Sequence, residues 1–242
     1  MKTIKKILFG FLTVIFLSCS SGYKNEEGII YYEHWNEGTG LHKDKIETNL
    51  ETFKILKFDS YAKDDESVFY KGEKVVGADA KTFDALGKFY AKDKNFGWYG
   101  KDKIKTSNGE NFKVINSYYS TDGFDIFYTT DPLKISDPSN FKFVYGGGNY
   151  ESWTTDGKNY YFNNYKVPSD DYENLKIYPK SGGLSKDKKW VYFLDHKLNY
   201  NPEGEKVVDT IDATSFIVTG YISCRDKYSC FNVYHGREKC NN

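Results

Sequence analysis

The sequence predicts an all-β protein, a tandem array of about six short antiparallel units. Aromatic residues make up 18% of the 242-residue chain, with 22 Tyr and 18 Phe against 5 Pro and 1 Met. This composition suits strands that have one packed face and one wet face. A charged turn followed by a run of aromatic residues also recurs from residue 64 to residue 226. Such a recurrence at about 30-residue intervals is typical of repeat proteins.

The first 18 residues are predicted to be a signal peptide. Three lysines in Met1–Lys6 precede an apolar run, Ile7–Leu17, broken only by Gly10 and Thr13. As a helix this run spans only about 16 Å, whereas the hydrocarbon core of a bilayer is about 30 Å thick. A permanent membrane span is therefore not expected.

Cys19 is predicted to be a lipidation site. The stretch Phe16-Leu17-Ser18-Cys19 resembles the lipobox of bacterial lipoproteins, in the loose form found in Bacteroidetes. It departs from the usual pattern, which has Leu three residues before the cysteine and a small residue two before it. The resemblance implies an acylated Cys19 and a cell-envelope address, at the outer membrane or facing the periplasm. The alternative is an ordinary signal peptide with a cysteine near its cleavage site.

The rest of the chain is divided into a tether at residues 19–27, a divergent opening element at 28–51 and a repeat domain at 52–242. Six turn aspartates anchor the repeat: Asp64, Asp93, Asp122, Asp156, Asp187 and Asp226. An aromatic residue stands five positions after each anchor: Phe69, Trp98, Phe127, Tyr161, Tyr192 and Phe231. A second aromatic residue stands six positions after each of the first five anchors: Tyr70, Tyr99, Tyr128, Phe162 and Phe193.

Each unit is expected to contain about three short strands separated by two polar turns. Aspartate beside glycine, asparagine or lysine supplies the local hydrogen bonds that tight turns need. Because side chains alternate across a strand, Phe127 is predicted to face the core and Tyr128 the opposite face. An open, solenoid-like stack is favoured over a closed propeller, whose four-stranded blades usually need about 40 to 45 residues.

Three stretches carry a family resemblance: Tyr61–Asp64, Tyr90–Asn95 and Asp156–Tyr161. They resemble the repeat of the DKNYY family, and the resemblance extends over about residues 50–240. It implies a bacterial, often exported protein made of repeated units. It carries over no functional residue and no activity.

No catalytic residue, cofactor or metal site is predicted. The four histidines lack metal-ligand spacing, and no Gly-x-Ser-x-Gly motif is present. Carboxylates cluster in the turns at 64–66 and 122–125, and these turns are expected to be solvated. Charge is balanced, with 34 Lys plus Arg against 34 Asp plus Glu, so no nucleic-acid partner is expected.

The expected function is that of a non-catalytic envelope lipoprotein that binds a protein or a glycan through an aromatic-rich sheet surface. The candidates for that surface recur beside Asn, Asp and Lys: Trp98, Tyr99, Trp153, Tyr160 and Trp190. The competing interpretation is that these rings are the core of the array. The alternative function is a glycan-acting hydrolase with two turn carboxylates about 5 to 10 Å apart.

Cys224 and Cys230 are predicted to form a disulfide across the last turn, because they flank it on neighbouring strands. The oxidising environment of an exported protein permits such a bond. Cys240 is the alternative partner of either, and one thiol is left over.

Replacement of Cys19 tests the address. We expect Cys19→Ala to abolish labelling by a fatty-acid probe and to release the protein from membrane fractions. A wild-type protein that takes up no lipid, together with unchanged membrane retention of the variant, would contradict the prediction.

Overall fold

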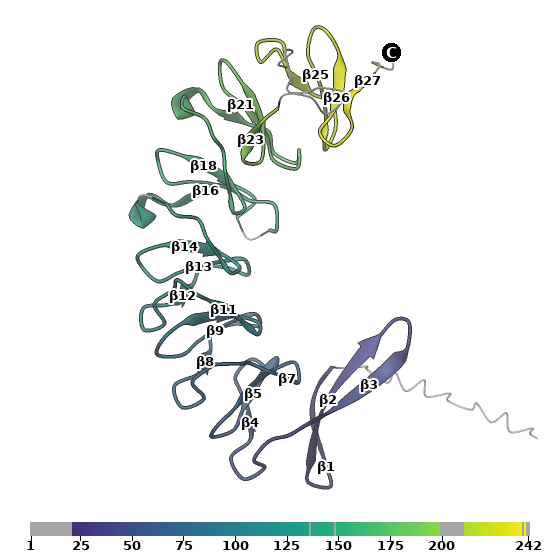
Figure 1. Cartoon of the computed structure of the whole chain (residues 1–242), viewed down its shortest axis with the longest axis vertical. Helices are drawn as coiled ribbons and strands as arrows, with labels where there is room; N and C mark the ends of the chain where they lie inside the picture. Colours follow the sequence, from purple (N-terminus) through teal and green to yellow (C-terminus); the bar gives the residue numbers. More distant parts are fainter. Residues whose placement is uncertain (1–20, 136, 148, 199–210, 239, 241–242) are drawn as a thin grey trace, which may run out of the picture.

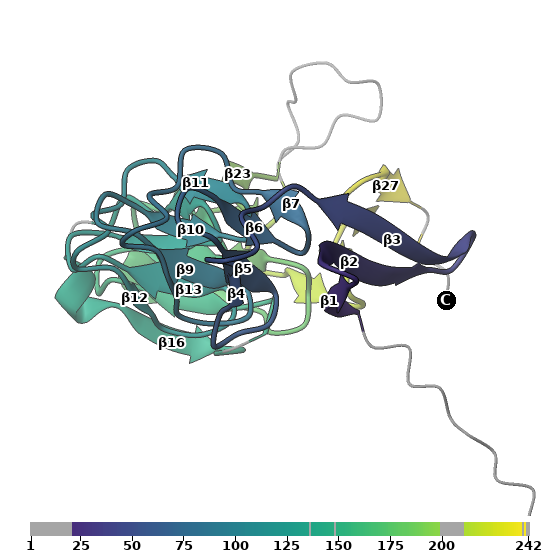
Figure 2. The same cartoon turned by 90° about the horizontal axis from the view of Figure 1, so that it is seen from below.

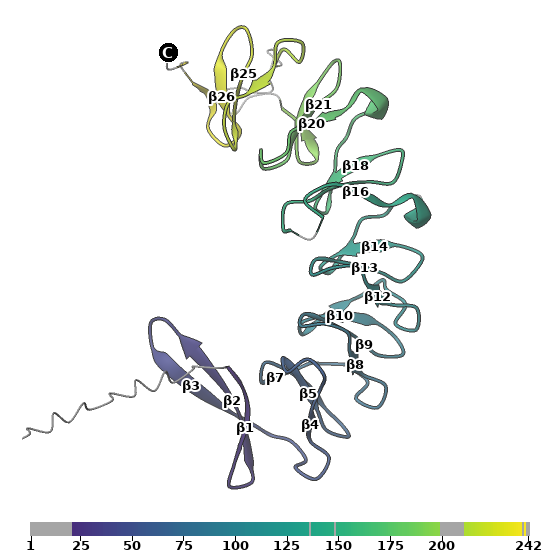
Figure 3. The ribbon, with the colours of Figure 1, turned by 180° about the vertical axis from the view of Figure 1, so that it is seen from behind.

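The computed structural model describes residues 21–135, 137–147, 149–198, 211–238 and 240. A three-stranded opening sheet is followed by six four-stranded antiparallel sheets, stacked one after another along a curved column (Figure 1). The two ends of the column lie apart, as the view from behind also shows (Figure 3). The predictions of an all-β class and an open array of tandem units are therefore confirmed.

The opening sheet consists of β1 (Gly22–Glu26), β2 (Ile29–Asn36) and β3 (Gly40–Ile46), with β2 in the middle. The turn between β1 and β2 has positive φ at Glu27 (50°) and Gly28 (82°), as hairpin turns of type I′ require. Tyr23 of β1 is buried against Tyr32, with ring centroids 5.0 Å apart. This packing makes residues 22–26 a strand, so the tether predicted for 19–27 is shorter than expected.

The strands of the repeat are short. The first two units contain β4 (Lys54–Ile55), β5 (Tyr61–Lys63), β6 (Val68–Tyr70) and β7 (Glu73–Lys74), then β8 (Asp84–Ala85), β9 (Tyr90–Lys92), β10 (Gly97–Tyr99) and β11 (Asp102–Ile104). The next two contain β12 (Lys113–Val114), β13 (Tyr119–Thr121), β14 (Ile126–Tyr128) and β15 (Asp131–Pro132), then β16 (Lys142–Tyr145), β17 (Trp153–Thr155), β18 (Tyr160–Phe162) and β19 (Tyr165–Lys166). The last two contain β20 (Lys176–Ile177), β21 (Leu184–Lys186), β22 (Val191–Phe193) and β23 (His196–Lys197), then β24 (Ile217–Val218), β25 (Ser223–Arg225), β26 (Cys230–Asn232) and β27 (Gly236–Glu238).

Each unit therefore has four strands where three were expected. The extended run expected before the anchor turn is divided into two strands: a first one that is usually two residues long, and a second one of three residues that leads into the turn. Outer strands of this length let about 30 residues complete a four-stranded sheet.

Both faces of a unit's sheet are covered by its neighbours. Phe127 faces the preceding unit, where it packs with Tyr90, Ile104 and Phe112. Tyr119 of the same sheet faces the following unit and packs in a cluster that includes its Tyr161. The core is thus a series of interfaces between sheets, as expected of a stack whose units cannot bury an apolar face alone.

The predicted register is confirmed by the burial of the aromatic residues. All six aromatics five positions after an anchor are at most 3% exposed: Phe69, Trp98, Phe127, Tyr161, Tyr192 and Phe231. The next position lies on the other face of the sheet. It is half-buried in the first three units, at Tyr70, Tyr99 and Tyr128, and buried at Phe162 and Phe193.

The anchor aspartates were expected to be solvated, but they are buried, with 2% to 7% of their surface exposed. In Asp93, Oδ1 accepts hydrogen bonds from the backbone N–H groups of Asn95 (2.8 Å) and Phe96 (2.9 Å). The other five anchors accept from the same two positions, two and three residues later, at 2.6–2.9 Å. These bonds satisfy a carboxylate that the stacking of units removes from water.

The second oxygen of the carboxylate reaches the linker that enters the unit. Oδ2 of Asp93 accepts the N–H of Asp79 at 3.1 Å. From the other side, Nζ of Lys63 donates to the carbonyls of Ala80 (2.6 Å) and Phe83 (2.9 Å). One linker is thereby fixed by the lysine of the unit before it and by the aspartate of the unit after it.

Two further linkers are held in the same way. Asp122 accepts from Asn108 N–H at 2.8 Å while Lys92 donates to Glu110 O at 3.0 Å. At the last linker, Asp226 accepts from the N–H of Asp212, and Lys186 donates to Ala213 O.

Threonine replaces the lysine in the third and fourth units. The hydroxyl of Thr121 donates within its own turn, to Asp125 O at 2.8 Å, and that of Thr155 donates to Asn159 O at 2.7 Å. Each of the linkers that follow contains a short 3-10 helix, η1 (Pro138–Asn140) or η2 (Tyr172–Asn174). The loss of the lysine contact thus coincides with the longer linkers.

Hydrogen bonding lowers the pKa of some anchors despite their burial. Burial by itself raises the pKa of Asp187, but the hydrogen bonds from Tyr192, Ser169, Trp190 and Lys189 outweigh it. The pKa values of Asp64 and Asp156 are lowered by the same kind of balance.

Alanine substitutions of neighbouring aromatics test the packing. We expect Phe127→Ala to cost about 3 to 5 kcal/mol of unfolding free energy, because the ring is fully buried. Tyr128→Ala should cost clearly less, since that ring is only half-buried. Urea unfolding of both variants measures the difference, and a larger loss for Tyr128→Ala would show that the register is wrong by one residue.

Acid should destabilise the stack. Carboxylates with a lowered pKa in the folded state stabilise it above the ordinary aspartate pKa of about 3.9, and this stabilisation is lost as the pH falls through their lower folded pKa values. We expect the urea midpoint to fall as the pH drops below about 4. Asp187→Asn should lower the midpoint at pH 7 and flatten its acid dependence. A wild-type midpoint that is constant between neutral and strongly acidic pH would contradict this.

Candidate binding surface

Two of the residues predicted for a binding surface lie in the core. Trp98 and Trp153 are each 1% exposed, because their positions in the sheet face a neighbouring unit. The indole N–H of Trp98 donates to Oδ2 of Asp93 at 2.9 Å. For these two residues the core interpretation is correct, and the binding-surface prediction is wrong.

The other three candidates are half-buried. Trp190 has Nζ of Lys189 and of Lys197 at 5.2 and 4.6 Å from its ring. Tyr160 packs beside Tyr172 of η2, with ring centroids 6.3 Å apart. Tyr99 belongs to a larger surface that is formed with other tyrosines.

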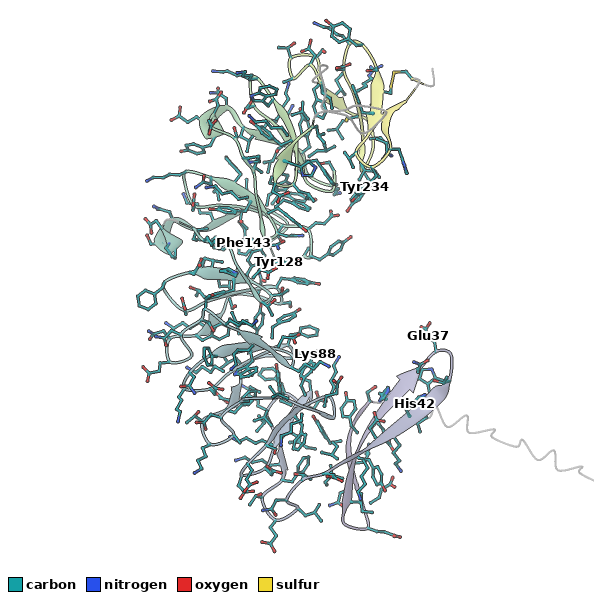
Figure 4. The ribbon with its side chains drawn as sticks, in the orientation of Figure 1. Glu37, His42, Lys88, Tyr128, Phe143 and Tyr234 are labelled. Atoms are coloured by element: carbon teal, nitrogen blue, oxygen red, sulfur yellow. A yellow bond between two sulfur atoms is a disulfide. The ribbon has the colours of Figure 1, made fainter. Side chains whose placement is uncertain are left out.

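That surface lies on the inner side of the curve. Lys88 and Tyr128 face this concave side (Figure 4). Tyr70 and Tyr99 hold the same register position as Tyr128 in the two preceding units, so they lie on the same side of the column. With Tyr118, which stacks on Tyr128, they form what we call the tyrosine row: Tyr70, Tyr99, Tyr118 and Tyr128.

The rings of the tyrosine row are paired. Tyr128 stacks on Tyr118 with centroids 6.0 Å apart and an interplanar angle of 14°. Tyr99 stacks on Phe89 at 5.8 Å and 29°, and Tyr70 lies 4.8 Å from Tyr61. Stacking covers one face of Tyr99, Tyr118 and Tyr128, whereas Tyr70 is tilted by 52° to Tyr61. The row also offers ring edges and hydroxyl groups.

The hydroxyls of Tyr70, Tyr99 and Tyr128 are protonated at neutral pH, because the pKa of each is raised. Burial, with a further contribution from Tyr118 and Tyr99, raises the pKa of Tyr128 to about 12. Burial also raises the pKa of Tyr70 and of Tyr99. The hydroxyl of Tyr128 donates to Tyr150 O at 3.2 Å. The hydroxyls of Tyr70 and Tyr99 can therefore both donate and accept a hydrogen bond, whereas that of Tyr128, whose O–H is already used, can accept one.

A cleft of about 630 Å³ lies where the opening sheet meets the first two units. The opening sheet stands to one side of the column, as the view along the column shows (Figure 2). The cleft is lined by Ser21, Tyr32, His34, Trp35, Asp44, Asp59, Ser60, Lys71, Glu73 and Lys88. The sequence analysis named none of these residues as a site, and those of the opening sheet lie outside the repeat register. The available signal was the run of β-branched and aromatic residues at 29–35, which is typical of a strand.

Two of the three carboxylates of the cleft have a cationic or titratable neighbour. Asp44 lies 3.4 Å from Nδ1 of His34, and Glu73 forms an ion pair with Lys101. Outside the cleft, burial raises the pKa of Asp125, and this carboxylate accepts a hydrogen bond from the N–H of Ile126 in its own turn. In the described part of the chain no group of three or more His, Cys, Asp or Glu residues is placed to hold a metal ion.

The disulfide joins Cys230 to Cys240, with a Cα–Cα distance of 5.1 Å, and not to Cys224 as predicted. In the register of β25 and β26, Cys224 lies opposite Phe231 and faces the core, whereas Cys230 lies opposite Arg225 on the other face. The hairpin to β27 pairs Cys230 with Glu238, and Cys240 follows two residues later on the same face. Burial raises the pKa of the free Cys224 thiol to about 12.

The fold defines a stacked β-repeat protein. Residues 4–102 match the model of the DKNYY family, which confirms the family resemblance. The match includes the opening sheet, the first unit and the second unit up to the start of β11, whereas the resemblance was predicted for about residues 50–240. No curated protein and no solved structure matches the chain.

Cys19 lies outside the described residues. Within the described ranges, no helix has the length and apolar character needed to cross a membrane.

The cysteine assignment can be checked chemically. In non-reduced protein we expect a crosslinked peptide pair containing Cys230 and Cys240, and alkylation of Cys224 only after unfolding, since a buried thiol with a raised pKa is unreactive. Peptide mapping by mass spectrometry reads both. Rapid labelling of Cys224 in the folded protein would contradict its placement.

Proposed function

We propose that this protein is a non-catalytic lipoprotein of the cell envelope that binds an extended polypeptide along its concave face. The tyrosine row is the observation that carries the proposal. Stacked repeats characteristically use their concave surfaces for binding. Tyrosine is also enriched at protein interfaces, because it combines a large ring with a polar group at low entropic cost.

The pairing of the rings favours a polypeptide over a glycan. Stacking on a sugar requires an open ring face, and Tyr118 and Tyr128 each have one of their two faces turned toward the other ring. The protonated hydroxyls that remain suit the N–H and C=O groups of an extended chain. A glycan is therefore the less favoured ligand of this surface.

The proposed address depends on Cys19. Its position after the apolar run Ile7–Leu17 favours acylation and retention at the envelope membrane. In that arrangement the repeat array lies outside the cytoplasm, where the bond between Cys230 and Cys240 can form.

A glycan-acting hydrolase is the second candidate, because the cleft gathers three carboxylates: Asp44, Asp59 and Glu73. Such an enzyme needs one carboxylic acid and one carboxylate about 5 to 10 Å apart. Polysaccharide turnover by the wild type that is lost in both Asp44→Asn and Asp59→Asn would establish this candidate in place of the binding protein.

Site-specific photo-crosslinking in intact cells tests the binding proposal. A photoreactive phenylalanine replaces either Lys88, which is exposed on the concave face, or Phe124, which is 72% exposed in an anchor turn at the other end of the strands. We expect position 88 to yield one discrete adduct that protease removes, and position 124 to yield none.

Equal crosslinking at both positions, or none at position 88, would contradict the proposal. An adduct that resists protease but is removed by glycosidases would identify a glycan ligand instead.

A further inference from the structure

We propose that the tip of the β2–β3 hairpin inserts into the surface of the lipid bilayer beside the anchor, as a second membrane contact. The inference rests on the proposed acylation of Cys19. Its occupant is a lipid surface, and its contact residues are Trp35 and Leu41.

Trp35 and Leu41 form an exposed apolar pair. They are directly opposite each other in the register of β2 and β3, and their exposed fractions are 55% and 58%. Three of the four tryptophans, Trp98, Trp153 and Trp190, are covered by neighbouring units or half-buried. The hairpin tip thus presents the most exposed Trp of the chain next to an exposed leucine.

The tip projects beyond the rest of the opening sheet. The pairing of β1 with β2 ends at Gly22 and Glu33, whereas the pairing of β2 with β3 continues to Asn36 and Gly40. The three residues beyond Glu33, which end at Asn36, extend about 10 Å at the rise of a strand. Figure 4 places Glu37 and His42 on this free end, away from the column.

The chain leads to the lipid anchor from the same place. Gly22 lies opposite Glu33, so the segment toward Cys19 leaves the sheet where the free part of the hairpin begins. Ser21 lines one cleft together with His34 and Trp35. Cys19 is two residues before Ser21, a reach of at most about 7 Å. A membrane that holds the acyl chains of Cys19 therefore lies within reach of the tip.

The chemistry of the tip suits the membrane interface. Tryptophan is enriched at the level of the lipid headgroups, and interfacial segments bury their apolar side chains about 5 to 10 Å deep. Of the nearby charged groups, Lys43 pairs with Glu26 and Glu33, and Asp44 lies 3.4 Å from Nδ1 of His34. Glu37 at the tip forms no ion pair among the described residues. With no basic patch in this described sheet, insertion depends on the apolar side chains and needs no anionic lipid.

Two contacts orient the protein where one does not. A flexible lipid tether alone leaves the column free to rotate about the anchor. A hairpin that is embedded beside the tether fixes the opening sheet against the membrane, and the packing of Tyr23 and Tyr32 with Ala62 and Phe69 transmits that orientation to the first unit.

Tryptophan quenching tests the proposal with full-length, lipidated protein in vesicles of phosphatidylcholine with brominated acyl chains. We expect part of the tryptophan emission to be lost relative to unbrominated vesicles, and this loss to disappear in Trp35→Phe. Trp35→Phe should still float with the vesicles, because the lipid remains.

A matched control places a tryptophan elsewhere. Phe124 is 72% exposed in an anchor turn, and Phe124→Trp in the Trp35→Phe background should show no quenching. Added salt should leave the quenching of Trp35 unchanged.

The outcomes separate the two proposals. If the wild type floats and its quenching equals that of Trp35→Phe, the hairpin does not insert, although the lipid anchor stands. If the wild type does not float, both the anchor and the insertion are overturned. Quenching in the Phe124→Trp control that equals the quenching of the wild type would show an unspecific association and would also overturn the inference.

Discussion

The buried anchor aspartate is the interaction on which the rest of the structure depends. One oxygen accepts two backbone N–H groups of its own turn, as at Asp93, and thereby closes the central hairpin of the unit. The other oxygen reaches the linker at Asp79. An ionised carboxylate is tolerated away from water only when its lone pairs are satisfied, and charge-assisted bonds to N–H groups are strong. The same side chain therefore shapes the unit and sets its spacing from the one before it.

Variation around the anchors follows from the same requirement. Where the linker is long and contains η1 or η2, the second oxygen accepts from side chains among the described residues. At Asp156 that oxygen accepts from the hydroxyl of Tyr161 (3.0 Å), and at Asp187 from Tyr192 and from Ser169 (2.7 Å). Tyrosine at the fifth position is thus both a core ring and a partner of the carboxylate, which phenylalanine at the same position in other units cannot be.

Stacking also determines where recognition can occur. Because the sheets inside the stack are covered on both faces, a partner of the column can approach only the ends and edges of their strands. On the concave side those ends carry the tyrosine row, and at the amino-terminal end the opening sheet adds a cleft and an exposed hairpin. The proposed roles divide accordingly, with the concave face for a polypeptide and the hairpin tip for the membrane.

The sequence by itself determined the repeat, its register and the inward direction of residues such as Phe127, because period and alternation are local properties of the chain. Only the tertiary structure decided that the anchor carboxylates are buried, that Trp98 and Trp153 belong to the core, and that β1 begins at Gly22, since each depends on a neighbouring unit or strand. The disulfide was likewise decided by β27, the last strand of the sixth unit. The pairing of β27 with β26 brings Cys240 to the face of Cys230, while the pleat turns Cys224 to the other face. A repeat pattern describes one unit, whereas burial and pairing are set by what is stacked against it.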